Sequence, residues 1–82
     1  MHDYVKRMEA ELKELEERIS KLSKFIESDT FKYIRYETQD LLTEQIGVMK
    51  HYQRLLQKRL QLEYEEFNAI EELKCKSNLL AH

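Results

Sequence analysis

The fold is decided by residues 3–28, which read DYVKRMEAELKELEERISKLSKFIES. Apolar residues recur in this stretch at spacings of three and four, and the positions between them are mostly Glu, Lys and Arg. The apolar positions are Val5, Met8, Leu12, Leu15, Ile19, Leu22 and Ile26. Only a helix places such positions on one stripe, because a strand would divide them between its two faces. The stretch therefore predicts a helix over residues 3 to about 28.

A longer helix is predicted for residues 39 to about 77, with Thr38 as its N-cap. This segment has no proline, and Gly47 is its only glycine. It carries two adjacent apolar stripes, so it can contact two neighbours. The first stripe consists of Leu42, Ile46, Met49, Leu56, Leu60, Phe67 and Ile70. The second consists of Leu41, Val48, Tyr52, Leu55, Leu62, Ala69 and Leu73.

The two helices predict an antiparallel helical hairpin that forms a single all-α domain over residues 1–82, with residues 78–82 as a loose tail. At 1.5 Å per residue the helices are about 39 Å and about 58 Å long, so the second overhangs the first beyond about Glu63. A hairpin of this size has too little core to stand alone. We therefore expect a helical homo-oligomer with an even number of chains. The expected interface residues are Tyr52, Phe67, Ile70 and Leu73.

The composition excludes several classes of function. The chain has 82 residues with one cysteine, and its 14 basic and 16 acidic residues give a net charge of −2. One cysteine excludes a disulfide framework and a thiolate zinc site, and the charge balance gives no basis for binding a nucleic acid polymer. No apolar run is long enough to cross a membrane. Glycine-rich phosphate loops, nucleophile elbows and zinc-helix motifs are absent. We expect a cytoplasmic protein that is not an enzyme and has no metal or cofactor.

One segment of the second helix, between residues 44 and 63, contains no acidic residue. Its basic residues are Lys50, His51, Arg54, Lys58 and Arg59. Lys50, Arg54 and Lys58 are four apart on one face, where like charges destabilise a helix by roughly 0.2–0.5 kcal/mol per pair. They either pair with acids of the first helix or form an anion site for phosphate groups. The acids in question are Glu9, Glu14, Glu16 and Glu17.

The connector, residues 31–36, mixes aromatic and basic side chains. One interpretation is that Tyr33 and Tyr36 stack on a nucleobase while Lys32 and Arg35 hold phosphate. The other is a hydrophobic plug at the open end of the hairpin, which suits the apolar residues of the connector, Phe31 and Ile34. Both interpretations stay open at the level of the sequence.

A broader pattern of apolar spacing and single polar residues runs from residue 9 to about residue 60. It consists of Glu11, Leu12, Leu15, Ile19, Leu22, Phe25, Ile26, Phe31, Gln39, Leu41, Leu42, Gln45, Met49, Tyr52, Leu55 and Arg59. This pattern resembles a group of short phage-encoded helical-hairpin proteins. More loosely, small helical hairpins that oligomerise resemble the phage sponge proteins that bind nucleotide signals of bacterial immunity, as in the anti-CBASS and anti-Thoeris sponges. That resemblance implies a non-catalytic protein that traps a cyclic nucleotide between subunits.

The functional hypothesis is therefore a phage anti-defence protein, in the cytosol of the host cell, that sequesters a cyclic dinucleotide or a cyclic ADP-ribose-like signal. An oligomer interface with cations and stacking surfaces would supply what such a ligand needs. The candidate ligand-binding residues are Lys32, Tyr33, Arg35, Tyr36, Lys50, His51, Arg54 and Lys58. The alternative is a helical protein-protein interaction module, an inhibitor or adaptor with no small-molecule ligand.

Overall fold

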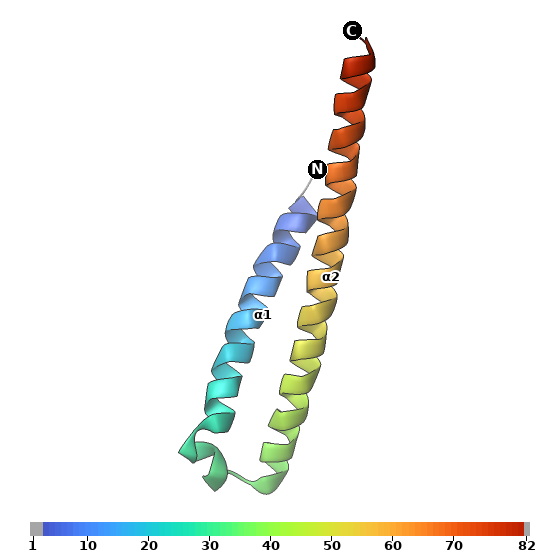
Figure 1. Cartoon of the computed structure of the whole chain (residues 1–82). Helices are drawn as coiled ribbons and strands as arrows, with labels where there is room; N and C mark the ends of the chain where they lie inside the picture. The colour runs from blue at the N-terminus through green and yellow to red at the C-terminus, as the bar shows by residue number, and fades with distance from the viewer. Residues whose placement is uncertain (1–2, 82) are drawn as a thin grey trace.

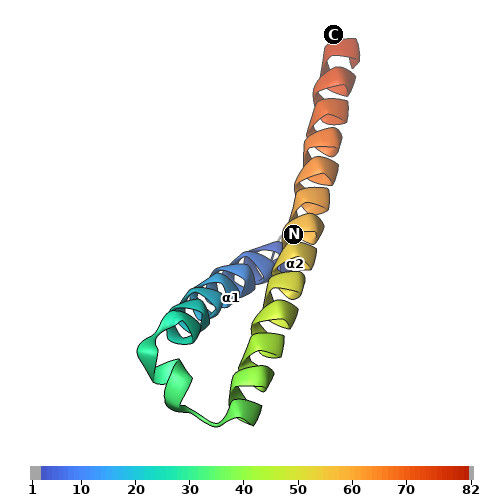
Figure 2. The ribbon, with the colours of Figure 1, turned by 60° about the horizontal axis from the view of Figure 1, so that its bottom comes forward.

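The computed structural model describes the backbone of residues 3–81 and the side chains of residues 3–66. It contains a first helix, α1 (Asp3–Glu27), a short 3-10 helix, η1 (Asp29–Tyr33), and a long helix, α2 (Tyr36–Ala81). The two long helices lie side by side and run in opposite directions, as Figures 1 and 2 show. The predicted all-helical hairpin is confirmed, and residues 3–81 contain no strand.

The second helix begins earlier than the sequence predicted. Its first turn starts at Tyr36, where the Gln39 backbone N–H donates to the Arg35 carbonyl at 3.0 Å, so Thr38 lies inside the helix and is not its N-cap. The side-chain amide of Gln39 also donates to the carbonyls of Phe31, at 2.9 Å, and Ile34, at 3.1 Å. These two bonds satisfy carbonyls that the end of η1 would otherwise leave without a partner, and they hold the connector against the start of α2.

The far end of the second helix also differs from the prediction. α2 continues to Ala81, so the residues from Asn78, which were expected to form a loose tail, are helical as far as Ala81. Neither proline nor glycine occurs after Gly47. Without such a residue, nothing local interrupts the repeating backbone hydrogen bonds of the helix.

The hairpin is held together by a single apolar seam between α1 and α2. One cluster joins Val5 and Met8 of α1 to Leu60 of α2, and a second is formed by Leu15, Ile19 and Leu56. Leu12 packs against both clusters, and Ile46 and Met49 pack against the second. Leu56 is fully buried, at 0% exposure. The seam therefore uses the stripe predicted for α1 and the first of the two stripes predicted for α2.

The overhang of the longer helix also agrees with the prediction. The hydroxyl of Tyr4, in the first turn of α1, donates to the carboxylate of Glu63 on α2, so α1 reaches no further along α2 than about this residue. Figure 1 shows the remainder of α2 extending beyond the start of α1. Three of the residues expected at an oligomer interface, Phe67, Ile70 and Leu73, lie outside the described side chains.

We expect Leu56→Ala to lower the free energy of unfolding by about 2–5 kcal/mol, because it removes the fully buried side chain of the seam and leaves a cavity. Chemical denaturation followed by circular dichroism measures this loss. Lys13→Ala, on the exposed side of α1, is the matched control and should change stability by less than about 0.5 kcal/mol. A similarly small effect for Leu56→Ala would show that the seam does not hold the hairpin together.

Candidate functional site

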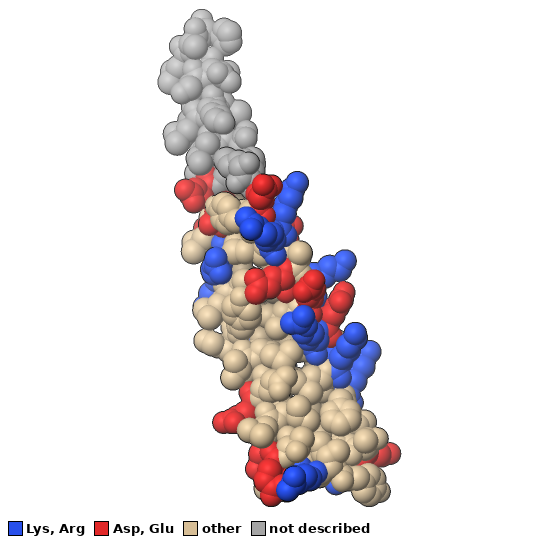
Figure 3. All heavy atoms as spheres, turned by 180° about the vertical axis from the view of Figure 1, so that it is seen from behind, with Lys and Arg blue, Asp and Glu red and all other residues tan. Residues whose placement is uncertain are grey.

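Lys50, Arg54 and Lys58 form a row of exposed basic side chains on α2, here called the basic row. Successive members are four residues apart, so they lie on neighbouring turns of one face, about 6 Å apart along the axis. Arg54 lies two residues before the buried Leu56, about 200° away from it around the helix, so it points away from the seam. Figure 3 shows Lys and Arg side chains, with Asp and Glu side chains among them, along one edge of the molecule.

The basic row has no acidic partner among the described side chains. Residues 3–66 contain three ion pairs, Arg18–Glu14 at 3.9 Å, Lys32–Asp29 at 3.8 Å and Arg35–Glu37 at 3.8 Å. None of these pairs joins α2 to α1, so the charge pairing across the hairpin that the sequence left open is not found there. The mutual repulsion along the basic row is therefore not relieved by acids of α1.

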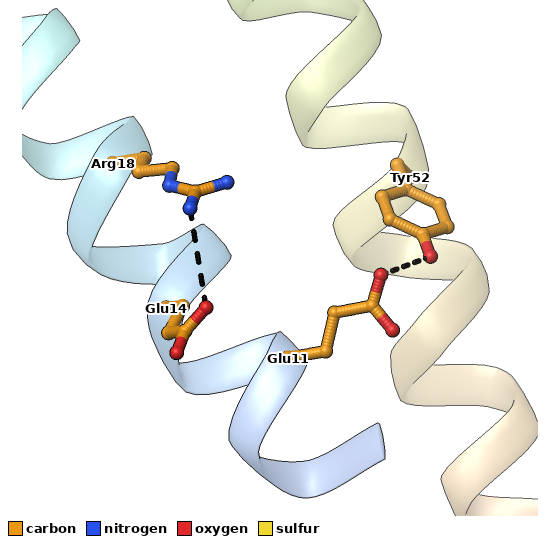
Figure 4. A network of polar contacts seen from close by, with 4 residues as sticks. All are labelled: Glu11, Glu14, Arg18 and Tyr52. Atoms are coloured by element: carbon orange, nitrogen blue, oxygen red, sulfur yellow. Dashed lines mark hydrogen bonds and ion pairs between the residues drawn. The ribbon is translucent and has the colours of Figure 1, made fainter. Parts of the chain in front are cut away.

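Two of the candidate partners on α1, Glu14 and Glu16, have other contacts, and so has Glu11, which was not a candidate. Glu11 accepts a hydrogen bond from the Tyr52 hydroxyl, and Glu14 turns back to Arg18 on its own helix, as Figure 4 shows. Glu16 accepts a hydrogen bond from the side-chain amide of Gln53 at 3.5 Å. Glu11 and Glu16 of α1 therefore meet neutral donors of α2 that lie beside the seam, while the cations of α2 lie further round the helix.

Tyrosine hydroxyls provide most of the polar contacts between the two helices. The hydrogen bond to Glu63 raises the pKa of Tyr4 above its usual value, and the bond to Glu11 does the same for the pKa of Tyr52. Loss of hydration is the largest cause of the raised pKa of Tyr64, and the nearby Glu9 adds to it. Tyr52, which the sequence placed at an oligomer interface, thus has its hydroxyl engaged within the chain while 39% of the residue stays exposed.

The connector combines features of both interpretations that the sequence left open. Phe31 is partly buried and packs edge-to-face on Phe25, with the ring centroids 6.1 Å apart, as a plug would. Tyr33 and Tyr36 are 86% and 71% exposed, so their faces are accessible. Lys32 and Arg35 are exposed as well, but each has an acidic neighbour in sequence as its partner.

The structure does not bring the two candidate clusters together within one chain. Tyr36 begins α2 and Lys50 lies fourteen residues further along it, which corresponds to about 21 Å along the helix axis. His51 is exposed and follows Lys50 directly, so it belongs with the basic row and not with the connector. One small ligand therefore contacts either the connector or the basic row of a given chain.

A shallow groove that the sequence did not reveal lies between the helices beside the basic row. Its volume is about 410 Å³, and it is lined by Glu9, Leu12, Gln57, Leu60, Gln61 and Tyr64. Leu60 is buried, whereas Gln57 and Gln61 are exposed and follow Arg54 and Lys58 by three residues each, which places them one turn further along α2. The one sequence feature that points to this groove is the spacing of four between Gln57 and Gln61, which places both amides on one face of the helix.

Gly47 is exposed on α2, and a β-carbon built on it meets no atom within 4 Å. The contacts within the described chain therefore do not require a glycine at this position. Gly47 lies one turn before Lys50 and His51, at one end of the basic row.

Two kinds of feature are absent from the described residues. These residues hold no group of three or more His, Cys, Asp or Glu side chains placed to bind a metal ion. None of the helices in that part of the chain is long and apolar enough to span a membrane.

Residues 3–81 thus form a small all-helical hairpin with an exposed basic row on its longer helix. A family model described as Sequestin matches residues 2–62, which include α1, η1 and the part of α2 that carries the basic row. The chain therefore belongs to the Sequestin family. No curated protein and no solved structure matches the chain. The family name indicates a sequestering protein, which confirms the resemblance drawn from the sequence at the level of the family.

We expect the free energy of unfolding to fall as the pH rises above about 10. The pKa of Tyr4, Tyr52 and Tyr64 is raised in the folded chain, so the folded state favours the protonated hydroxyls. Their contribution is complete below the pKa of the unfolded chain and is lost as the pH rises through the raised values. Denaturation at a series of alkaline pH values measures the slope. Tyr4→Phe with Tyr52→Phe should make it shallower, and an unchanged slope would contradict the assignment.

Gly47→Ala should raise the free energy of unfolding by about 0.5–1 kcal/mol, because alanine is the better helix former and its β-carbon meets nothing in the chain. Thermal and chemical denaturation measure this gain. If the variant is instead destabilised, α2 is not a regular exposed helix at this position.

Proposed function

We propose that the protein binds and sequesters a cyclic nucleotide second messenger, a cyclic dinucleotide or a cyclic ADP-ribose-like molecule, without changing it chemically. The observation that carries the proposal is the basic row, in which Lys50, Arg54 and Lys58 face solvent and find no acid among residues 3–66. Membership of a family with a sequestering name supports it. Sequestration needs binding alone, so the proposal requires no catalytic group.

Phosphate is the chemistry that the basic row suits best. Cations on successive turns repel one another, and an anion placed between two of them replaces that repulsion by charge-assisted hydrogen bonds. Arg54 at the centre offers a planar fork that binds two phosphate oxygens at once. A ligand with two phosphates engages more than one member of the row, which distinguishes it from a single inorganic anion.

The groove next to the basic row suits the less polar part of the same ligand. Its floor is apolar at Leu60, and the side-chain amides of Gln57 and Gln61 offer both donors and acceptors to the edge of a nucleobase. Glu9 is an acceptor for amino or hydroxyl groups and is unsuited to phosphate. We therefore place phosphate on the basic row and base or ribose in the groove.

The connector residues Lys32, Tyr33, Arg35 and Tyr36 join this site only if another chain supplies them, because they lie about 21 Å from the basic row of their own chain. Binding at an oligomer interface remains part of the proposal, because only a second chain could bring a connector close to the basic row. The competing proposal is a helical protein-protein interaction module with no small-molecule ligand, and the exposed apolar side chains of α2 favour it.

Arg54→Gln should weaken nucleotide binding by about 1.5–3 kcal/mol, roughly ten- to a hundredfold, because it removes one charge-assisted contact. Calorimetry with a panel of cyclic dinucleotides and cyclic ADP-ribose isomers measures the affinity. Arg18→Gln, which removes an arginine from the exposed side of α1, is the matched control and should bind like the wild type. The stability of the unliganded Arg54→Gln variant should be unchanged or slightly higher, because repulsion along the row is relieved.

Two further results separate the competing proposals. A ligand at 100 times its dissociation constant stabilises the wild type by about 2.7 kcal/mol, and the same nucleotide should be recovered unaltered after the complex is denatured. If no member of the panel binds tighter than about 100 µM, a free energy near −5.5 kcal/mol, the interaction module is the better description. A chemically altered nucleotide would exclude simple sequestration.

A further inference from the structure

The groove between the helices has one charged residue among its lining, and this residue is the acid Glu9. The other lining side chains are apolar, aromatic or amides, namely Leu12, Gln57, Leu60, Gln61 and Tyr64. The basic row lies beside the groove and has the opposite charge. A ligand that occupies both therefore meets cations at one end and a carboxylate at the other.

The packing of the seam holds Glu9 at the edge of the groove. Glu9 follows Met8, which packs against Leu60, so the acid lies level with Leu60 along the hairpin. Adjacent helix positions point in directions about 100° apart, and this rotation takes Glu9 out of the seam and into the lining of the groove. Gln57, on the other wall, lies about 4.5 Å along the axis from Arg54, so the groove begins within one turn of the basic row.

The carboxylate of Glu9 keeps its charge and most of its capacity to accept hydrogen bonds. Glu9 belongs to none of the ion pairs within residues 3–66, whereas Glu14 of the same helix pairs with Arg18. Loss of hydration and the charge of Glu9 raise the pKa of Tyr64, which lies beside the acid in the groove. A carboxylate accepts several hydrogen bonds on its two oxygens, so a contact with one tyrosine leaves acceptors for a ligand.

We propose that Glu9 determines the specificity of the nucleotide site, by selecting a ligand that presents two adjacent hydrogen-bond donors to the groove. This inference rests on the proposed function and narrows the class of ligand. Two parts of a nucleotide carry such a pair of donors, the cis-diol of a ribose and the ring N–H with the 2-amino group of guanine. Both suit the two oxygens of one carboxylate, and an acidic residue that binds ribose hydroxyls is a common feature of nucleotide sites.

The same carboxylate disfavours other groups at this position. A phosphate there would be repelled by a like charge. Adenine presents its amino group beside a ring nitrogen that is an acceptor, and two acceptors that face each other are unfavourable. Gln57 and Gln61 do not discriminate in this way, because an amide offers both a donor and an acceptor. Glu9 therefore also orients the ligand, with its phosphates on the basic row and its donors in the groove.

Two pairs of probes test the proposal, and the members of each pair differ only in hydrogen-bond donors. Cyclic di-IMP lacks the 2-amino groups of cyclic di-GMP, and the 2′-deoxy analogue of cyclic ADP-ribose lacks one ribose hydroxyl. Calorimetry measures the affinity of each probe for the wild type and for Glu9→Gln. The first pair tests a guanine edge and the second tests a ribose diol, so the two sources of the donors are separated.

In the pair that the wild type binds, the intact probe should bind about tenfold more tightly than the analogue without the donor. Glu9→Gln should lose most of this preference, because the carboxamide presents an amino group to one of the two donors. It should weaken the intact probe about tenfold and bind the analogue at least as tightly as the wild type does, since a negative charge near the phosphates is gone. Glu14→Gln removes the same charge from α1 outside the groove, and this matched control should keep the preference.

The outcomes separate failure of this inference from failure of the proposed function. If the wild type binds a pair of probes and Glu9→Gln leaves their affinity ratio unchanged, the role of Glu9 is overturned and sequestration stands. Tighter binding of cyclic di-AMP than of either donor-bearing probe would overturn it as well. If the wild type binds no probe, the proposed function fails, and the inference fails with it.

Discussion

The burial of Leu56 against Leu15 and Ile19 fixes how α2 is rotated relative to α1, and every other surface of the molecule follows from that rotation. Once this side of α2 faces inward, Leu55 is left exposed to solvent, and the basic row around Arg54 points in another direction again. A helix has 3.6 residues per turn, so adjacent positions such as these point in directions about 100° apart. Because packing at the seam fixes the rotation of α2, it also fixes where the apolar face, the cationic face and the groove lie around this helix.

The separation of charge in this protein depends on the neutral polar residues beside the seam. Tyr52 and Gln53 meet Glu11 and Glu16 before any cation of α2 does. A tyrosine hydroxyl or a glutamine amide satisfies a carboxylate without introducing a positive charge. The acids of α1 thus contribute to joining the helices, and Lys50, Arg54 and Lys58 of α2 form no ion pair among residues 3–66.

Much of the fold was accessible from the sequence, because it depends on local periodicity. The spacing of Val5, Met8, Leu15 and Ile19 predicted both the helix and its buried face. The start of α2 was missed because the side chain of Gln39 bonds to the carbonyls of Ile34 and Phe31, in a connector whose conformation the apolar spacing does not specify. The preference of threonine for N-cap positions favoured Thr38, and such a preference carries no information about the Gln39 contacts.

The candidate site was predicted less completely, because a sequence shows which residues are charged but not which residues they contact. The sequence singled out Lys50 and Arg54, and it left open whether acids of α1 would neutralise them. That question depends on the rotation of α2 by a fraction of a turn. The groove depends on the same rotation, since Gln57 and Gln61 line it only because Leu60 points into the seam.

The elongated outline has a consequence for hydrodynamics. The chain measures 72 × 17 × 15 Å, so it is more than four times as long as it is wide. A rod of this shape experiences more friction in solution than a sphere of equal mass, and it leaves a gel-filtration column as early as a heavier globular protein. An elution volume alone would therefore mimic a dimer even for a single chain. Equilibrium methods, in which friction cancels, report the mass itself.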